Sequence, residues 1–301
     1  MEEIKKLFNS LNLEPLETIK VLSNGLNNEN YVINSKYCWK KIKNSYLFDT
    51  HQNEKDILEK DDKYTLYYSD DTNICFNFIK GSNLNVNEFR NEIQEITKVV
   101  KEFHLIQIIT EKFWEVVIPQ KMKLLKTNTS YFNELNILYN KITTSLSNFN
   151  NIENDLCLCH HDIHGDNILK YVNTDNNQVH YTLIDLEFAF TNYYFVDIAN
   201  LLCEMYTDYH GQVYTYENIK HEDKLKILKS YFNIPNNNND DDDNDGVTLE
   251  MIEKLDVGID VSHFYWAYWG FLLDEQEQDI DFDYKKFANS RLHQLKLKYN
   301  V

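Results

Sequence analysis

The chain has no long apolar run and no basic cluster, and each absence excludes a class of protein. No apolar run in the 301 residues approaches the roughly 20 residues that cross a bilayer, so no transmembrane segment is expected. The first 15 residues, MEEIKKLFNSLNLEP, are charged and amphipathic, which is unlike a signal peptide and predicts a surface helix. With a formal net charge of −18, the chain is not expected to bind nucleic acid, although its acidity is compatible with a cationic small substrate.

The cysteines do not suggest a disulfide framework. Their number is odd, they are scattered along the chain, and no secretory signal is recognisable. We therefore expect reduced thiols in a cytoplasmic setting. The five are Cys38, Cys75, Cys157, Cys159 and Cys203.

The chain divides into a β-rich part and a helical part, which predicts an α+β fold. Short strand-like runs are predicted over residues 18–34, 36–42 and 73–79, with a short helix at 50–60. After Gly81 apolar residues recur at helical spacing, first over residues 86–106 and again over 131–146. We expect a small N-terminal lobe of residues 1–80 and a larger, mostly helical C-terminal lobe of residues 81–301.

Residues 236–246, NNNNDDDDNDG, form a stretch of low complexity. The stretch cannot bury apolar area, so we expect a disordered surface loop. A calcium site is the alternative, because an acidic run that ends in glycine is superficially similar to an EF-hand loop. The alternating ligand pattern and the closing glutamate of such a loop are missing, however.

The segment 159–187, CHHDIHGDNILKYVNTDNNQVHYTLIDLE, carries the strongest chemical signal. Asp162 is followed five residues later by Asn167, and alternating apolar residues predict a strand that ends at Asp185, with Glu187 two residues beyond. Magnesium prefers oxygen ligands, so Asn167 and Asp185 are natural partners for it beside triphosphate oxygens. Asp162 is then free to accept a proton from a hydroxyl group. The pattern indicates phosphoryl transfer from a nucleoside triphosphate, whereas solvated turn residues are the alternative.

Two motifs in this region resemble a known family. CHHDIHGDN is similar to the motif H-x-D-x-x-x-x-N of the choline/ethanolamine kinase and aminoglycoside phosphotransferase superfamily, which has a bilobal protein-kinase-like fold. LIDLEFAFTNYYFVDIANLLCEMYTDY, residues 183–209, resembles the more specific choline/ethanolamine kinase signature. The resemblance implies ATP- and Mg²⁺-dependent phosphorylation of choline or ethanolamine, the first step of a route to phospholipids, by an enzyme that is often a homodimer.

The resemblance also implies roles for individual residues. Asp162 would be the catalytic base and His160 would shape the catalytic loop. Asp197 would cap the following helix and brace the loop backbone. The metal would be held by Asn167 and Asp185, with Glu187 close to it.

A zinc site is an alternative use of the histidines and cysteines in this region. The candidate ligands are Cys157, Cys159, His160, His161 and His164. Alternation along a strand would split them between two faces, and no CxxC pair exists. We therefore expect the two cysteines to be core residues and His164 to be a polar loop residue.

The segment SNGLNNENYVI, residues 23–33, lies between two predicted strands. Because the chain has only seven glycines, Gly25 in a turn is informative. Ser23, Asn24 and Asn28 offer hydrogen bonds to phosphates. An ordinary hairpin is the alternative, but the segment resembles the phosphate-covering loop S-x-G-x-x-N of the family.

The next strand, KYCWKKIK, would carry the phosphate-binding cation. We choose Lys41 by position; Lys40 is adjacent and must face the opposite side of the sheet. Glu54 is the expected ion-pair partner, with Glu59 as the second choice, and an exposed Lys–Glu pair is the alternative interpretation. The strand that leads to the hinge would meet the adenine through Asn77, Phe78 and Ile79.

An aromatic stripe near the C-terminus suggests an amine pocket. Trp266 and Trp269 are three residues apart on one helical face, which by itself is typical of a core. The family has W-x-x-W in the corresponding helix, where it forms part of an aromatic box that attracts ammonium groups. The remaining residues that the resemblance assigns to the box are Glu204, Tyr209, Phe282 and Phe287.

The chain departs from the family at Phe188, where relatives usually have tyrosine and its hydroxyl. A phenyl face still stacks on a methylated ammonium, whereas the primary ammonium of ethanolamine would want more acceptors. We therefore favour choline over ethanolamine. Other small-molecule kinases of the superfamily, acting on aminoglycosides, thiamine or sugars, are one alternative, and a catalytically inactive binding protein is another.

Overall fold

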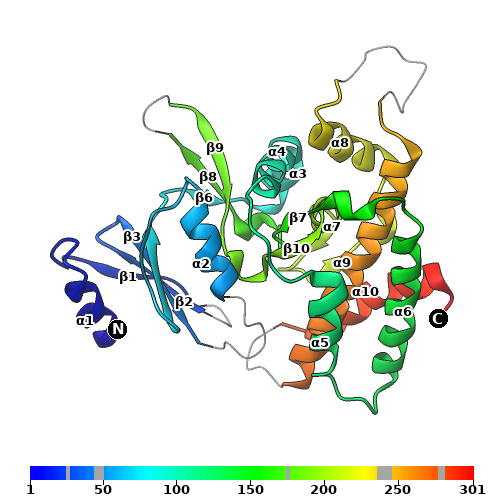
Figure 1. Ribbon diagram of the computed structural model, residues 1–301, viewed down its shortest axis with the longest axis horizontal. Coiled ribbons are helices and arrows are strands. Elements are labelled where there is room, and N and C mark those ends of the chain that lie inside the picture. Colours follow the sequence, from blue (N-terminus) through cyan, green and yellow to red (C-terminus); the bar gives the residue numbers. More distant parts are fainter. Residues whose placement is uncertain (25–27, 44–50, 174–176, 236–245, 277–281) are drawn as a thin grey trace.

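The computed structural model describes residues 1–24, 28–43, 51–173, 177–235, 246–276 and 282–301. Its N-terminal region is built on a five-stranded antiparallel sheet with the strand order β1-β2-β3-β5-β4 (Figure 1). The strands are β1 (Ile19–Asn24), β2 (Asn28–Ile33), β3 (Tyr37–Ile42), β4 (Leu66–Ser69) and β5 (Asn73–Asn77). Strand β4 was not predicted, whereas the other four fall within the predicted runs.

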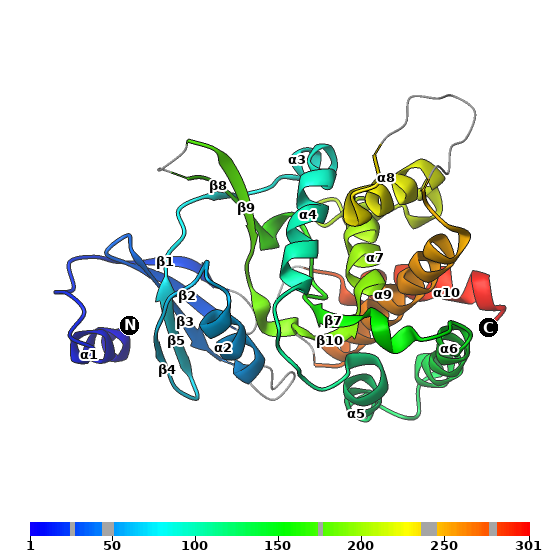
Figure 2. The ribbon, with the colours of Figure 1, turned by 45° about the horizontal axis from the view of Figure 1, so that its top comes forward.

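The two faces of this sheet are covered by different helices. Helix α1 (Glu2–Ser10) lies against one face and α2 (His51–Lys60) against the other (Figures 1 and 2). Ile4 and Phe8 of α1 are fully buried and most of its other residues are exposed, as expected of an amphipathic surface helix. They form a small separate core, the α1 cluster, with Tyr31, Ile33, Tyr37, Trp39 and Cys75.

The remainder of the chain is mostly helical (Figure 2). Most of the main core lies in it. Its helices are α3 (Val86–Asn91), α4 (Ile93–His104), α5 (Ile118–Met122), α6 (Ser130–Ser147), α7 (Tyr194–Glu204), α8 (His221–Phe232), α9 (Leu249–Glu275) and α10 (Tyr284–Tyr299). The predicted helix over 86–106 is broken at Glu92, which ends α3 and precedes α4. The long helix α9 packs against both α7 and α10, and its residues 255–273 are almost entirely buried.

Short strands connect the helices and position the candidate catalytic segment. Strand β7 (Leu156–Cys159) pairs with β10 (Phe190–Tyr193), and a second sheet has the order β6-β8-β9. The strands of that sheet are β6 (Ser82–Asn83), β8 (Ile168–Val172) and β9 (Val179–Leu183), and a further hairpin joins β11 (Thr207–Asp208) to β12 (Val213–Tyr214). The predicted strand before Asp185 therefore exists, but it ends two residues earlier, at Leu183.

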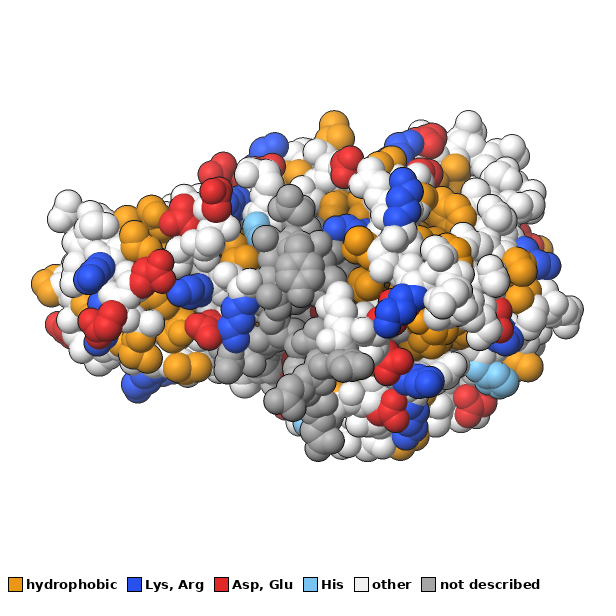
Figure 3. Space-filling view, turned by 90° about the horizontal axis from the view of Figure 1, so that it is seen from below, with side chains coloured by type: hydrophobic (Ala, Val, Ile, Leu, Met, Phe, Trp, Pro, Cys, Tyr) orange, Lys and Arg blue, Asp and Glu red, His pale blue; other side chains and the backbone are white. Residues whose placement is uncertain are grey.

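The predicted fold class is confirmed: a β-rich N-terminal region precedes a helical C-terminal region. The exact division at residues 80 and 81 stays a prediction. In the described part of the chain, no helix is both long and apolar enough to cross a membrane. Acidic and basic side chains are interspersed over the face that Figure 3 shows. Residues 236–245 of the expected acidic loop lie outside the described residues.

Candidate active site

The loop between β7 and β8 brings Asp162 and Asn167 into contact. The Asn167 side-chain amide donates to Asp162 Oδ2 over 2.8 Å and to the Asp162 carbonyl over 2.9 Å. His160 is buried under this loop; its Nε2 lies 2.9 Å from the Ile184 carbonyl, and its Nδ1 accepts the Asp162 amide over 3.2 Å. The imidazole thus ties the loop to the segment that carries Asp185.

Asp197, from the first turn of α7, holds the start of the same loop. Its Oδ2 accepts the His160 amide over 2.6 Å, and its Oδ1 accepts the His161 amide over 2.7 Å. His104 Nε2 lies 3.0 Å from Oδ2, and Asp197 is fully buried. Burial alone would raise the pKa of Asp197, but the hydrogen bond and charge of His104 bring it below its ordinary value. Asp197 therefore remains a carboxylate.

Asp185 and Glu187 follow β9 and lie around one buried lysine, Lys40. The Lys40 ammonium is 2.7 Å from Asp185 Oδ1 and 3.7 Å from Glu187 Oε2. It also contacts both carboxylate oxygens of Glu54, at 2.9 and 3.0 Å. Burial by itself would lower the pKa of Lys40, but the surrounding carboxylates, Asp185 foremost, hold it well above its ordinary value. Lys40 is therefore a fixed positive charge between α2 and the Asp185 segment.

The choice of Lys41 as the cation of the nucleotide site is wrong. Lys41 lies on the α1 side of the sheet, where its ammonium is 2.7 Å from Glu3 Oε2. Lys40 points to the other side, towards α2, together with Cys38. Successive side chains of a strand face opposite sides, so only one of the two lysines can reach Glu54. The expected partner Glu54 was the correct one of the two glutamates for this ion pair.

A cavity of about 460 Å³ lies beside Lys40, and its lining combines apolar and acidic side chains. Lys40, Glu54, Asn167 and Asp185 form its polar side. The three residues expected to meet adenine also line the cavity: Asn77, Phe78 and Ile79. The amides of Asn77 and Phe78 already donate to the Thr65 and Lys36 carbonyls, so these two amides are not available to an adenine.

The expected phosphate-covering loop is only partly described. Gly25 lies outside the described residues, and of Ser23 and Asn24 only the backbone in β1 is described. Asn28, at the start of β2, is buried, and its side-chain amide donates to Glu187 Oε2. Asn28 of the N-terminal region is therefore hydrogen-bonded to Glu187 of the C-terminal region.

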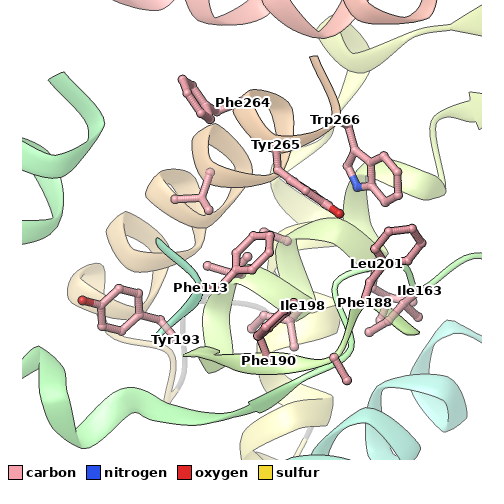
Figure 4. Close-up of a cluster of buried hydrophobic side chains, with 14 of the residues drawn as sticks. Phe113, Ile163, Phe188, Phe190, Tyr193, Ile198, Leu201, Phe264, Tyr265 and Trp266 are labelled. Carbon is pink, nitrogen blue, oxygen red and sulfur yellow. The ribbon is translucent and has the colours of Figure 1, made fainter. Parts of the chain in front are cut away.

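The residues expected to form an aromatic box come together. The ring of Trp266 lies 6.0 Å from Phe188, 5.2 Å from Trp269 and 6.3 Å from Phe287 between ring centres. Tyr209 lies 6.2 Å from Phe287 and also faces Phe282. Figure 4 shows the rings of Phe188 and Trp266 next to each other. Four segments thus contribute rings to one place: the β9–β10 connection, the β11–β12 turn, α9, and α10 with the residues just before it.

Glu204 lies at the edge of this region but is already paired. Its two oxygens accept hydrogen bonds from Arg291 of α10 and, over 2.7 Å, from the Tyr209 hydroxyl. Arg291 is fully buried, and its guanidinium lies 4.5 Å from the Tyr216 ring centre. Sequence reasoning missed Arg291. Its sequence signal was its helical spacing, four residues after Phe287 and four before Leu295, which places it on the apolar face of α10.

Among the residues that the structure describes, one group of side chains has the geometry of a candidate metal site: His104, Cys157 and Cys159, whose ligand atoms lie within 4.8 Å of one another. The two sulfur atoms are 3.6 Å apart because residues two apart on β7 share a face. His160 and His161 turn away from this group, towards Ile184 and Phe188. The five residues considered as zinc ligands were expected to lie on two faces. His160 and His161 do point away from the two cysteines, and the cysteines lie next to each other.

The architecture defines the class of fold, which is protein-kinase-like. The choline kinase LicA from Streptococcus pneumoniae superposes with a TM-score of 0.71 at 18% identity, covering 99% of both chains. The choline kinase from Cryptosporidium parvum gives 0.70 at 18% identity, covering 99% of this chain and 95% of that one. At these identities the likeness shows the fold.

The chain belongs to the choline/ethanolamine kinase family, whose model matches residues 19–296. Probable choline kinase 2 of Arabidopsis thaliana is 31% identical over 150 residues, which cover 48% of this chain and 40% of the relative. Ethanolamine kinase 2 of Homo sapiens is 23% identical over 243 residues, covering 76% of this chain and 59% of the relative. The chain thus spans less than two thirds of the length of the curated relatives that it matches.

Proposed function

We propose that this chain is an ATP- and Mg²⁺-dependent kinase that phosphorylates the hydroxyl group of choline or ethanolamine. The observation that carries the proposal is the convergence of Asp162, Asn167 and Asp185 beside a buried Lys40–Glu54 ion pair. Phosphoryl transfer needs positioning and charge stabilisation more than covalent chemistry, and these groups supply both. The family and its named relatives support the class of substrate.

The residues present fit a magnesium ion bound with the nucleotide. Asn167 and Asp185 line the cavity with oxygen atoms, the ligands that magnesium prefers, and Glu187 lies beside them. The Asp185 side chain is 39% exposed, so its second oxygen is accessible while Oδ1 contacts Lys40. When bound, the ion neutralises charge on the β- and γ-phosphates.

Asp162 would act as the base. Its Oδ2 is held by Asn167, and its side chain is 16% exposed, so it remains accessible to a small alcohol. The carboxylate accepts the proton of the substrate hydroxyl while that oxygen forms its bond to the γ-phosphorus and the bond to the ADP oxygen breaks. His160 and Asp197 act through the loop backbone and are positioning residues.

The aromatic rings around Trp266 would receive the amine end of the substrate. Cation–π attraction to such rings is worth about 0.5–2 kcal/mol per contact. The proposed contacts are the rings of Phe188, Tyr209, Trp266, Trp269, Phe282 and Phe287, with Glu204 at the edge. Because Glu204 is paired with Arg291, the rings rather than a free carboxylate would carry most of the attraction.

The test is an ADP-release assay with ATP and magnesium over choline, ethanolamine, thiamine and kanamycin. Turnover with choline or ethanolamine is expected, and chelation of magnesium by EDTA should abolish it. Asp162→Asn should lower kcat by about 10²–10⁴, because a positioned base supplies that much, and should keep nucleotide affinity. Turnover with kanamycin or thiamine alone would identify another kinase of the superfamily. No turnover with any acceptor would point to an inactive binding protein.

A further inference from the structure

Two adjacent residues of α9 each bury a polar atom that has no hydrogen-bond partner among the described residues. The atoms are the hydroxyl of Tyr265 and the indole N–H of Trp266, in residues that are 2% and 6% exposed. The great majority of buried polar groups in proteins are hydrogen-bonded, because an unpaired one is costly. Their position therefore suggests a polar group of a bound molecule.

Tyr265 lies against the rings that the amine is proposed to contact. Its ring centre is 4.9 Å from Trp266, 6.4 Å from Phe188 and 4.9 Å from Phe113. In Figure 4 its hydroxyl points away from the α9 backbone, on the side where the rings of Trp266 and Phe188 lie. The hydroxyl therefore lies beside the aromatic region.

The surroundings of the Tyr265 hydroxyl are acidic as well as aromatic. Burial, followed by the negative charge of Asp162 and then that of Tyr268 and Glu187, raises the pKa of Tyr265 well above its ordinary value. The phenol therefore stays protonated and keeps the lone pairs of a neutral hydroxyl. An oxygen in this setting suits a cationic donor, whereas the indole N–H of Trp266 can only donate and cannot bind an ammonium group.

We propose that Tyr265 is a specificity-determining residue, whose hydroxyl oxygen accepts a hydrogen bond from the ammonium group of the substrate. Phe188 offers no hydroxyl to this region, whereas Tyr265 brings one to it from α9. A quaternary ammonium has no N–H to donate, so the contact distinguishes amines by their methylation. This inference rests on the proposed function. It adds to that site a contact with an N–H group of the substrate.

The test is a series of amino alcohols with zero to three methyl groups: ethanolamine, its N-methyl and N,N-dimethyl derivatives, and choline. Tyr265→Phe should lower kcat/KM about tenfold or more for the three amines that carry an N–H, because hydrogen bonds to charged groups are strong. Choline should change by less than about threefold, since it loses no hydrogen bond. Phe188→Tyr in the Tyr265→Phe background should restore part of the loss.

Tyr268→Phe is the matched control, because Tyr268 is buried on the same helix and donates to the Lys121 carbonyl over 3.0 Å. It should leave the ratio between amines unchanged. Equal losses for choline and ethanolamine in Tyr265→Phe, or no loss, would overturn the role of Tyr265 and leave the proposed function standing. If the wild-type protein phosphorylates none of the four amines, both the proposed function and this role are refuted.

Discussion

Replacing Lys40 by methionine tests how the charges of the candidate site are balanced. Lys40 is 2% exposed and stands between Glu54, Asp185 and Glu187. The Glu54 side chain is only 3% exposed, so without Lys40 its carboxylate would be buried and unpaired. Removing one partner of a buried ion pair costs about 3–5 kcal/mol of unfolding free energy. That is a large fraction of the roughly 5–15 kcal/mol that stabilises a typical protein.

The loss of stability in Lys40→Met should depend on pH. Burial, the largest influence, raises the pKa of Glu54 above 4.5 even when Lys40 is present, and without Lys40 this pKa should rise further. A folded-state pKa above the unfolded value contributes stability below the unfolded pKa and loses it as pH rises through the folded one. The deficit of Lys40→Met relative to wild type should therefore be larger at pH 8 than at pH 5.

Urea unfolding followed by circular dichroism measures this deficit, and the ADP-release assay measures activity. Loss of one preorganised charge from a catalytic site typically lowers kcat by about 10²–10³. The matched control is Lys41→Met, which removes the same charge from the same strand but only an exposed pair with Glu3. It should have little effect on either measurement. If Lys41→Met lowers stability and activity as much as Lys40→Met, the predicted balance of charges around Lys40 is refuted. It is also refuted if the stability lost in Lys40→Met does not depend on pH.

Two further predictions concern the catalytic loop. Asp197→Asn should lower the unfolding free energy by roughly 3–5 kcal/mol, because it weakens buried hydrogen bonds to two loop amides; urea unfolding checks this, with the exposed Asp71→Asn as control. Although burial opposes it, the Asp162 carboxylate raises the pKa of His164 from 6.5 to about 9. The stability that His164 contributes should be full below about pH 6.5 and lost as pH rises through about 9, and His164→Gln should not show this loss. A parallel pH dependence in the variant would contradict the ion pair.

The part of the site that is contiguous in sequence could be predicted. Asp162 and Asn167 share one short loop, and Asp185 and Glu187 follow one strand, so local spacing alone brings each pair close together. Their contact with each other needs only the β8–β9 hairpin, whose alternating residues were visible in the sequence. The roles of these residues stay predictions, whereas their proximity is observed.

The choice between Lys40 and Lys41 could not be made from the sequence, because both faces of β3 are covered. Burial usually distinguishes the two sides of a strand, but here α1 covers the face of Tyr37 and Trp39 while the cavity and α2 cover the other. Five of the six residues of β3 are buried, so alternation gives no signal. The position of α1 against the sheet had to be known before either lysine could be assigned to a face.

Arg291 and Tyr265 were missed for a related reason. Arg291 lies 87 residues beyond its partner Glu204, and nothing local indicates the pairing. Tyr265 stands beside Trp266 in a helix that is apolar on all sides, so its hydroxyl could not be assigned to a face. The surroundings of both residues depend on contacts between segments that are far apart in the sequence. A single sequence does not reveal such contacts.

The α1 cluster has a consequence for the motions of the molecule. Its side chains form a core of their own, separate from the main core that contains α2 and the C-terminal helices. A region with few buried contacts to the rest can open while the remainder stays folded, with a smaller free energy than global unfolding. Amide protons of α1 should then exchange with deuterium faster than those in the middle of α9. Such an opening would expose the α1-facing side of the strand that carries Lys40 but leave the hydrogen bonds of Asp197 intact. The N-terminal and C-terminal regions of the chain would therefore differ in their exchange rates.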